Sequence, residues 1–241
     1  MERLPRILML WASPRSRSTA FFRMMCERGD FSVLHEPFSY LAEFGRCRVE
    51  DREVHTGTEL LAALRELSAR GPLFVKDTTD ERYPAVLADQ AFLATDAVHT
   101  MIIRHPAATI ASYHALNPDV QRHQIGVEAQ YEIFRAVWDA TGTPPVVVDS
   151  DDLVAEPEAT VRAYCAGTGI PYRPEALAWQ PENRPEWNPS ERWHADAGAS
   201  SGFHARQRAY DVDVATHPVY REYLAHHLPF YEKLHAHRVQ P

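Results

Sequence analysis

A short apolar run, a polar turn and an amphipathic helix follow one another near the N-terminus, and this succession constrains the fold most. Residues 7–11 are typical of a buried strand, and residues 18–28 place apolar side chains at helical spacing before Gly29. The turn between them carries Arg15 and Arg17 together with hydroxyl side chains. A helix N-terminus offers unpaired N–H groups and the positive end of the helix dipole. The segment therefore predicts an anion-binding turn of an α/β fold.

The turn differs from the loop that holds nucleoside triphosphates. That loop, G-x-x-x-x-G-K-[ST], needs glycines and a lysine that this segment lacks. Residues 13–19, Ser-Pro-Arg-Ser-Arg-Ser-Thr, instead resemble the 5′-phosphosulfate loop of the sulfotransferase family, Pro-Lys/Arg-Ser-Gly-Thr/Ser-Thr. Arg17 stands where that family usually has glycine, so either the backbone avoids positive φ or the side chain has an unusual role. The resemblance implies that five residues bind the donor: Arg15, Ser16, Arg17, Ser18 and Thr19.

A second strand followed by a helix resembles the 3′-phosphate motif of the same family. Residues 99–104 are typical of a buried strand, and Pro106 suits the first position of the following helix. The family pattern is Arg-x-Pro with a serine eight residues after the arginine, here Arg104 and Ser112. Ser112 should lie roughly 9 Å along the helix, where an extended guanidinium can meet a phosphate. The resemblance implies that this pair holds the 3′-phosphate.

A third segment resembles the family's strand, Glu/Asp-Asp-Leu and Pro-x-x-Thr pattern. Residues 145–149 form the expected strand, and Pro157 lies near the first turn of the next helix. We expect Asp152 to cap or pin a helix rather than to catalyse. Because three motifs occur in the family's order across residues 7–170, the chain resembles small bacterial-type sulfotransferases that use 3′-phosphoadenosine 5′-phosphosulfate.

Alternating strands and helices predict the fold class. Further elements are expected as strands at residues 31–35 and 73–76 and as helices at 58–67, 128–140 and 217–235, the last kinked at Pro229. We expect one α/β domain over residues 1–241 with core 7–170, in three layers: a central, mostly parallel five-stranded sheet flanked by helices.

Residues 179–204 show neither strand nor helix periodicity and hold three tryptophans among several prolines. Such a long loop is usually a lid or binding surface, although its aromatic side chains could equally cover a core edge. In sulfotransferases a late loop closes over the nucleotide, and residues 200–206 are its nearest counterpart here. The resemblance implies that Ser201, Gly202 and Phe203 contact the donor.

Two strand ends compete to supply the catalytic base. His35 and Glu36 follow one predicted strand, and Lys76 and Asp77 follow another, at the carboxyl ends where open α/β sheets bind ligands. Sulfotransferases use a histidine or a carboxylate there. We favour Glu36 as the base, with His35, Lys76 and Asp77 as alternatives. The competing interpretation of Glu36 is a purely structural one, in which it is a turn carboxylate paired with a nearby arginine. Lys76 could instead assist Arg15 in stabilising the leaving oxygen.

The resemblance implies sulfuryl transfer from 3′-phosphoadenosine 5′-phosphosulfate to a hydroxyl or amine of a small-molecule or sugar acceptor. The product would be adenosine 3′,5′-bisphosphate, and the donor's two phosphate positions require two separated anion sites. In-line transfer of this kind depends on positioning and charge stabilisation. In this family a cation and backbone N–H groups serve that role, so we expect no metal; the thirteen histidines contain no H-E-x-x-H pattern.

Two other functions stay open. A kinase-like enzyme would use ATP and Mg²⁺, and a binding module would keep the nucleotide fold without the base. The net charge of −8 argues against nucleic-acid and anionic-membrane partners, although six arginines fall within residues 1–28. The three cysteines are scattered, and no run approaches the ~20 apolar residues of a membrane span. We expect a cytoplasmic enzyme without disulfides, and the sequence leaves its oligomeric state open.

Overall fold

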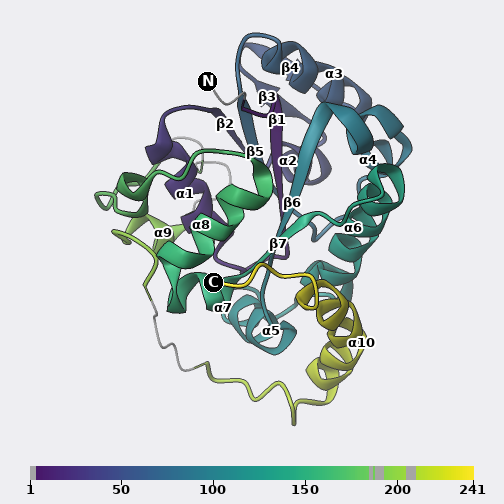
Figure 1. Cartoon of the computed structure of the whole chain (residues 1–241). Coiled ribbons are helices and arrows are strands. Elements are labelled where there is room, and N and C mark those ends of the chain that lie inside the picture. Colours follow the sequence, from purple (N-terminus) through teal and green to yellow (C-terminus); the bar gives the residue numbers. More distant parts are fainter. Residues whose placement is uncertain (1–3, 185–186, 188–192, 205–209) are drawn as a thin grey trace.

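The computed structural model describes residues 4–184, 187, 193–204 and 210–241. Its central sheet has five strands in the order β2-β5-β1-β6-β7, and every pairing in that sheet is parallel (Figure 1). The strands are β1 (Ile7–Ala12), β2 (Ser32–His35), β5 (Leu73–Thr78), β6 (Ala97–Ile103) and β7 (Val146–Asp149). This confirms the predicted mostly parallel five-stranded sheet.

The central strand β1 contributes to both faces of the sheet. Ile7, Met9 and Trp11 belong to one core layer. Leu8 and Leu10 belong to the other, because successive side chains of a strand point to opposite faces. The helices that cover the first face include α3 (Gly57–Ser68), α6 (Val127–Thr141) and α10 (Pro218–His235). Those that cover the second include α1 (Ser18–Arg28) and α8 (Pro157–Thr168). The three-layer α/β architecture is confirmed.

Several predicted boundaries agree with the structure. Helix α1 has the predicted bounds and ends at Gly29, whose φ of 67° is the left-handed conformation common after helices. Strand β6 begins two residues earlier than predicted and ends before Arg104. Helix α10 continues through Pro229. Asp152 pairs with Arg238 at 2.9 Å, so it pins the C-terminal segment.

Some short elements have too few residues to show a periodic pattern in the sequence. Strands β3 and β4, which pair as a hairpin, have three residues each, too few to show an alternation. The remaining elements are α2 (Pro37–Phe44), β3 (Cys47–Val49), β4 (Arg52–Val54), α4 (Pro84–Ala88), a π-helix (Phe92–Asp96), α5 (Pro106–His114), a 3₁₀ helix (Arg122–Ile125), α7 (Ser150–Ala155), a second 3₁₀ helix (Pro174–Leu177) and α9 (Ala195–Gly198). Within the described residues, no helix has the length and apolar character needed to cross a membrane.

The predicted loop of residues 179–204 covers part of a core layer and lines part of a cavity. Trp179 and Trp187 are buried in the core layer on the α1 side of the sheet, so these rings cover a core edge. Helix α9 interrupts the loop, and Ala178 forms an antiparallel bridge with Gly202. Trp193, by contrast, lines the cavity described below.

Gly126 packs against both the turn after β1 and the residue that follows β5. Its φ is 80°, and a Cβ there would lie 2.6 Å from Pro14 Cδ and 2.8 Å from the Thr79 carbonyl oxygen. The Thr79 hydroxyl donates to the carbonyl oxygens of Ala12 and Gly126 at 3.1 and 2.9 Å. Three segments therefore meet where only a glycine fits.

We expect Gly126→Ala to destabilise the protein more than Gly142→Ala. Both glycines flank α6 with positive φ, but nothing lies within 4 Å of a Cβ at Gly142. The control change should lower the free energy of unfolding by about 1 kcal/mol through backbone strain. Gly126→Ala should cost roughly 1–3 kcal/mol more, because the added methyl group overpacks the turn. Urea unfolding measures both, and equal losses would contradict the packing argument.

Candidate active site

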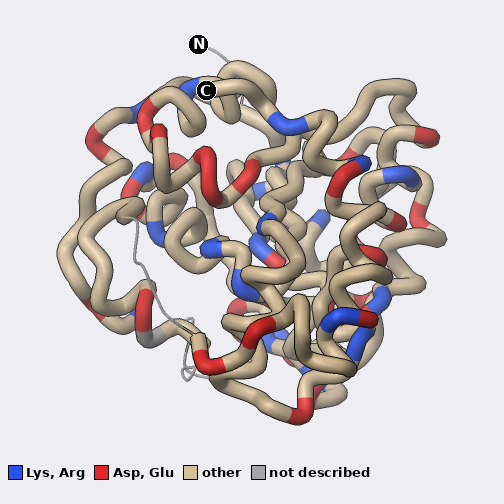
Figure 2. The backbone as a smooth tube through the Cα atoms, turned by 90° about the horizontal axis from the view of Figure 1, so that it is seen from below, with Lys and Arg blue, Asp and Glu red and all other residues tan. Residues whose placement is uncertain are grey.

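A cavity of about 380 Å³ opens at the carboxyl ends of the parallel strands. Its lining comes from the segments that follow β1, β2, β5 and β6, and from residues 193–204 and Tyr210. Viewed from below, towards these strand ends, Lys and Arg segments gather near the middle, while Asp and Glu segments lie mostly around them (Figure 2). The cavity lining carries both signs of charge: its cations are Arg15, Arg17, Lys76 and Arg104, and its carboxylates are Glu36, Glu43, Asp80, Glu81 and Asp196.

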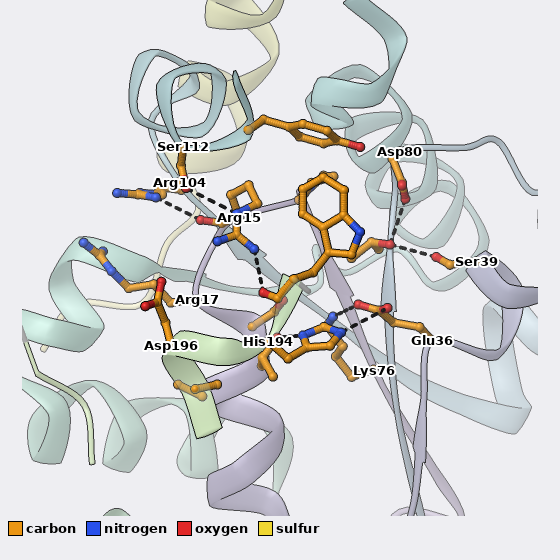
Figure 3. Close-up of a pocket in the computed structure, with 18 of the residues that line it drawn as sticks. Arg15, Arg17, Glu36, Ser39, Lys76, Asp80, Arg104, Ser112, His194 and Asp196 are labelled. Carbon is orange, nitrogen blue, oxygen red and sulfur yellow. Dashed lines mark hydrogen bonds and ion pairs between the residues drawn. The ribbon is translucent and has the colours of Figure 1, made fainter. Parts of the chain in front are cut away.

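Arg15, Arg104 and Ser112 meet on one wall of the cavity (Figure 3). Arg15 Nε donates to Ser112 Oγ at 3.2 Å, and Arg104 Nη1 donates to the Arg15 carbonyl oxygen at 3.0 Å. Arg15 Nη1 also donates to the Trp193 carbonyl oxygen at 2.8 Å. Arg15 and Ser112, which the sequence analysis assigned to two different anion sites, are thus in direct contact.

Arg17 keeps a positive φ and also carries a specific contact. Its φ is 62°, in the left-handed region that suits the glycine of the family pattern. Its Nη1 donates to the Ser150 carbonyl oxygen at 2.8 Å and forms an ion pair with Asp151. The side chain therefore ties the start of α1 to the start of α7. Burial lowers the pKa of Arg104, and the nearby charge of Arg17 lowers it further.

The hydroxyl residues of the turn differ in their placement. Ser18 and Thr19 line the cavity, whereas Ser16 does not. The Ser16 hydroxyl is buried and has no hydrogen-bond partner. No side chain caps the N-terminus of α1, which leaves its first N–H groups for an anion.

Glu36 and Lys76 form a buried ion pair at the end of the cavity opposite Arg17 (Figure 3). Their side chains are 9% and 1% exposed. Burial by itself would raise the pKa of Glu36, but attraction to Lys76, followed by that to His35 and His194, lowers it to about 2. The partner of this turn carboxylate is thus a lysine rather than the arginine considered from the sequence. Glu36 also has a positive φ of 51°.

Two of the predicted alternative bases, His35 and Asp77, lie behind the cavity and do not line it. Asp77 accepts hydrogen bonds from the backbone N–H groups of Phe38 and Ser39 at 2.6 and 3.0 Å. Burial raises the pKa of Asp77 to about 7. The His35 Nδ1 lies 2.9 Å from the Tyr40 hydroxyl, and burial lowers the pKa of this imidazole well below its usual value. Through these hydrogen bonds, His35 and Asp77 both fix the position of α2.

The late segment is only partly on the cavity wall. Gly202 and Phe203 line it, whereas Ser201 does not; the Ser201 Oγ lies 3.3 Å from His204 Nε2. Ala205 and Arg206, the end of the predicted lid motif, lie outside the described residues.

Sequence reasoning missed His194 and the backbone role of Trp193. His194 Nδ1 lies 3.0 Å from Thr19 Oγ1, and its Nε2 lies 4.0 Å from Glu36 Oε2. Burial lowers the pKa of His194 to about 4, so the ring is neutral at pH 7. The segment before α9 has no motif, and its tryptophan content was the one available signal.

The far side of the cavity from Arg17 also carries carboxyl groups. Asp80 accepts a hydrogen bond from Thr78 Oγ1 at 2.7 Å, and burial raises the pKa of this carboxyl to about 6. Glu43 and Glu81 line the cavity as well. The site therefore has an arginine-rich end and an end that can accept hydrogen bonds.

Comparison with known proteins agrees with this geometry. A family model described as a sulfotransferase domain matches residues 6–238. The crystal structure of a sulfotransferase from Alicyclobacillus acidocaldarius is 14% identical, covers 98% of this chain and 97% of its own, and has a TM-score of 0.52, which supports the fold.

Two curated relatives come from Arabidopsis thaliana and are called branched-chain-amino-acid aminotransferase-like proteins 2 and 1. They are 28% identical over 246 residues and 27% identical over 250 residues. These alignments cover 96% and 97% of this chain but only 42% of each relative, so the chain spans less than half of their length. Because the family model matches nearly the whole sequence, this chain belongs to the sulfotransferase domain family.

Proposed function

We propose that the protein transfers a sulfuryl group from 3′-phosphoadenosine 5′-phosphosulfate to a hydroxyl or amine of a small-molecule acceptor. One observation carries the proposal: Arg15, Arg104 and Ser112, which come from two separate strand-to-helix connections, converge on one cavity. Guanidinium groups form the strongest hydrogen bonds with phosphate and sulfate oxygens. The membership of this chain in the sulfotransferase domain family supports the same reaction class.

The contact between the two motifs suits this particular donor. Its 3′-phosphate and its 5′-phosphosulfate are attached to the same ribose, so two motifs that line one cavity can each hold one of these groups. ATP lacks the 3′-phosphate that Arg104 and Ser112 would hold. The turn also lacks the lysine and glycines of the triphosphate loop. Both points favour the sulfate donor over the kinase-like alternative.

The chemistry assigned to these residues is charge stabilisation. In-line sulfuryl transfer puts negative charge on the oxygen that leaves with adenosine 3′,5′-bisphosphate, and Arg15 with the N–H groups of α1 would stabilise it. These fixed positive groups supply what a metal ion would supply in a kinase. We therefore propose a reaction that needs no metal.

Glu36 is the proposed base, and Lys76 is its regulator. While Lys76 holds the carboxylate, the pKa of about 2 makes Glu36 a weak base. The donor's phosphosulfate is a second anion for the Lys76 ammonium. A lysine drawn towards it would assist at the leaving group and would release Glu36 to accept the acceptor's proton.

The acceptor side points to a small polar molecule. A cavity of about 380 Å³ lies within the usual range for small-ligand sites. Asp80, Glu43 and Glu81 offer acceptors for the hydrogens of hydroxyl or amine groups. The net charge of −8 disfavours nucleic acid and anionic membrane as partners.

We expect Arg104→Ala to remove the preference for a 3′-phosphate. In the wild type, adenosine 3′,5′-bisphosphate at about 100 times its Kd should add ~2.7 kcal/mol to the free energy of unfolding. Loss of the charged hydrogen bonds should weaken this ligand roughly 10–100-fold, to near the affinity of AMP. Thermal unfolding with bisphosphate, AMP and ATP measures the effect.

Arg82→Ala is the matched control for that experiment, because Arg82 pairs with Glu132 and Glu128 outside this cavity. It should leave the bisphosphate shift unchanged. A variant Arg104→Ala that still prefers bisphosphate over AMP would contradict the assignment. Equal stabilisation of the wild type by ATP with Mg²⁺ would favour the kinase-like function instead.

We expect Glu36→Gln to lower kcat by at least about 100-fold while bisphosphate affinity changes only a few fold. The low pKa means that Glu36 is ionised at neutral pH, so the substitution removes one negative charge at nearly constant shape. Turnover would be measured with the best acceptor from a screen of phenols, alcohols and amino sugars.

Glu158→Gln is the control for Glu36→Gln, because Glu158 lies on α8, pairs with Arg162 and does not line the cavity. Its turnover should stay within a few fold of the wild type. Full activity of Glu36→Gln would exclude Glu36 as the base. Tight bisphosphate binding without sulfation of any acceptor would favour the non-catalytic module.

A further inference from the structure

His35, Glu36 and His194 form a cluster whose spacing is unusual for a hydrogen-bonded group. Glu36 Oε2 lies 3.8 Å from His35 Nδ1 and 4.0 Å from His194 Nε2, which are both too long for a hydrogen bond. One ligand atom from each residue lies within 4.8 Å of the other two, and all three residues are buried. The ligand atoms of a tetrahedral Zn²⁺ ion lie about 2.0–2.2 Å from the metal and therefore roughly 3.4 Å from one another. The three side chains would have to approach one another by up to about 1.4 Å to surround a single ion.

A buried polar atom without a partner gives a second, independent sign. The His35 side chain is 1% exposed, and its Nε2 has no hydrogen-bond partner among the described residues. Such atoms are rare in proteins and call for an explanation. The ring packs edge-on against Phe22 and His194, which restricts its orientation, and its Nδ1 lies 2.9 Å from the Tyr40 hydroxyl.

The contacts around His194 match those of metal-binding histidines. Such histidines usually use one ring nitrogen for the ion and the other for a hydrogen bond that orients the ring. His194 fits this pattern, since its Nδ1 lies 3.0 Å from Thr19 Oγ1 while its Nε2 is on the side of Glu36. In His35 the Nδ1 that lies 2.9 Å from the Tyr40 hydroxyl is also 3.8 Å from Glu36 Oε2, so an ion bound at Nδ1 would replace that hydroxyl.

Glu36 divides its two oxygens between different neighbours. Oε1 accepts from Lys76, while Oε2 faces the imidazoles. Figure 3 shows His194 and Lys76 beside Glu36 at one end of the cavity. A cation at Oε2 would be repelled by the lysine ammonium, so Lys76 and the ion compete for one carboxylate.

We propose that His35, Glu36 and His194 form a binding site for one Zn²⁺ ion, reached from the cavity through His194 and Glu36. Two imidazoles and one carboxylate are an established ligand set for zinc, with a fourth position left for water. Bound Zn²⁺ would occupy the proposed base and would therefore inhibit sulfuryl transfer. This inhibition rests on the proposed function, whereas the binding itself does not.

The experiment measures metal binding on the full chain without any turnover. Zn²⁺ alone is titrated in competition with a chromophoric chelator, and Co²⁺ alone is followed by its visible absorption. We expect one ion per chain, at least about 100-fold weaker binding in His194→Ala and in His35→Ala, and tighter binding in Lys76→Met. Removal of a metal ligand should weaken Zn²⁺ binding by more than the ~10–100-fold typical of removing a residue that only hydrogen-bonds to a ligand.

His204→Ala is the control, because His204 lines the same cavity but lies outside the cluster. It should bind Zn²⁺ as the wild type does. Absence of one-to-one binding in the wild type would overturn the proposal, and so would unchanged affinity in His194→Ala. His194 lies outside the core sheet, so that variant remains informative if His35→Ala fails to fold. The link to turnover is tested separately, by measuring whether Zn²⁺ inhibits sulfuryl transfer and whether a chelator restores it.

Discussion

Two arginines in the left-handed region of the backbone map shape the turn between β1 and α1, and the cavity depends on this turn. Arg15 and Arg17 both have a φ of 62°, which costs a residue other than glycine roughly 1–2 kcal/mol. Contacts from outside the turn offset this cost, since Arg104 donates to the Arg15 carbonyl oxygen and Arg17 reaches the Ser150 carbonyl oxygen. The shape of this turn is therefore held by side chains rather than by glycine flexibility.

The same contacts connect the three sequence motifs physically. Arg104 belongs to the second motif and holds the first, while Asp151 in the third receives Arg17. The third motif was expected to be structural, and its observed role is to anchor the arginine that replaces the usual glycine. Strain at functional positions persists where surrounding structure fixes it, and here that structure comes from β6 and α7.

Regular periodicity explains which parts of the fold could be predicted. The apolar run of β1 and the helical spacing of α1 gave bounds close to those observed, because burial on a sheet and on a helix follows fixed periods. Arg104 and Ser112 were identified by their resemblance to a family motif, whose fixed spacing reflects a local strand-to-helix geometry. His194 could not be found in this way, since its contact with Thr19 joins residues 175 positions apart.

The contact between the two motifs that carry the predicted anion sites has a related explanation. A motif specifies the path of its own few residues, but the distance between two motifs depends on how β1 and β6 pair. In the structure these strands are neighbours in the sheet, so the connections that follow them emerge side by side. Direct contact between Arg15 and Ser112 then follows from sheet topology, which the local pattern around either residue does not encode.

Glu36 shows how one backbone position can make several outcomes compete. Glu36 has a positive φ, and its carboxylate lies beside Lys76, His35 and His194. A carboxylate has only two oxygens, and here one is occupied by the ammonium while the other faces the rings. Removal of the lysine by an anionic donor would free a base, whereas a metal ion at the rings would block it. Under both proposals the competition centres on the Lys76–Glu36 ion pair: an anionic donor would compete with Glu36 for Lys76, and a metal ion would compete with Lys76 for Glu36.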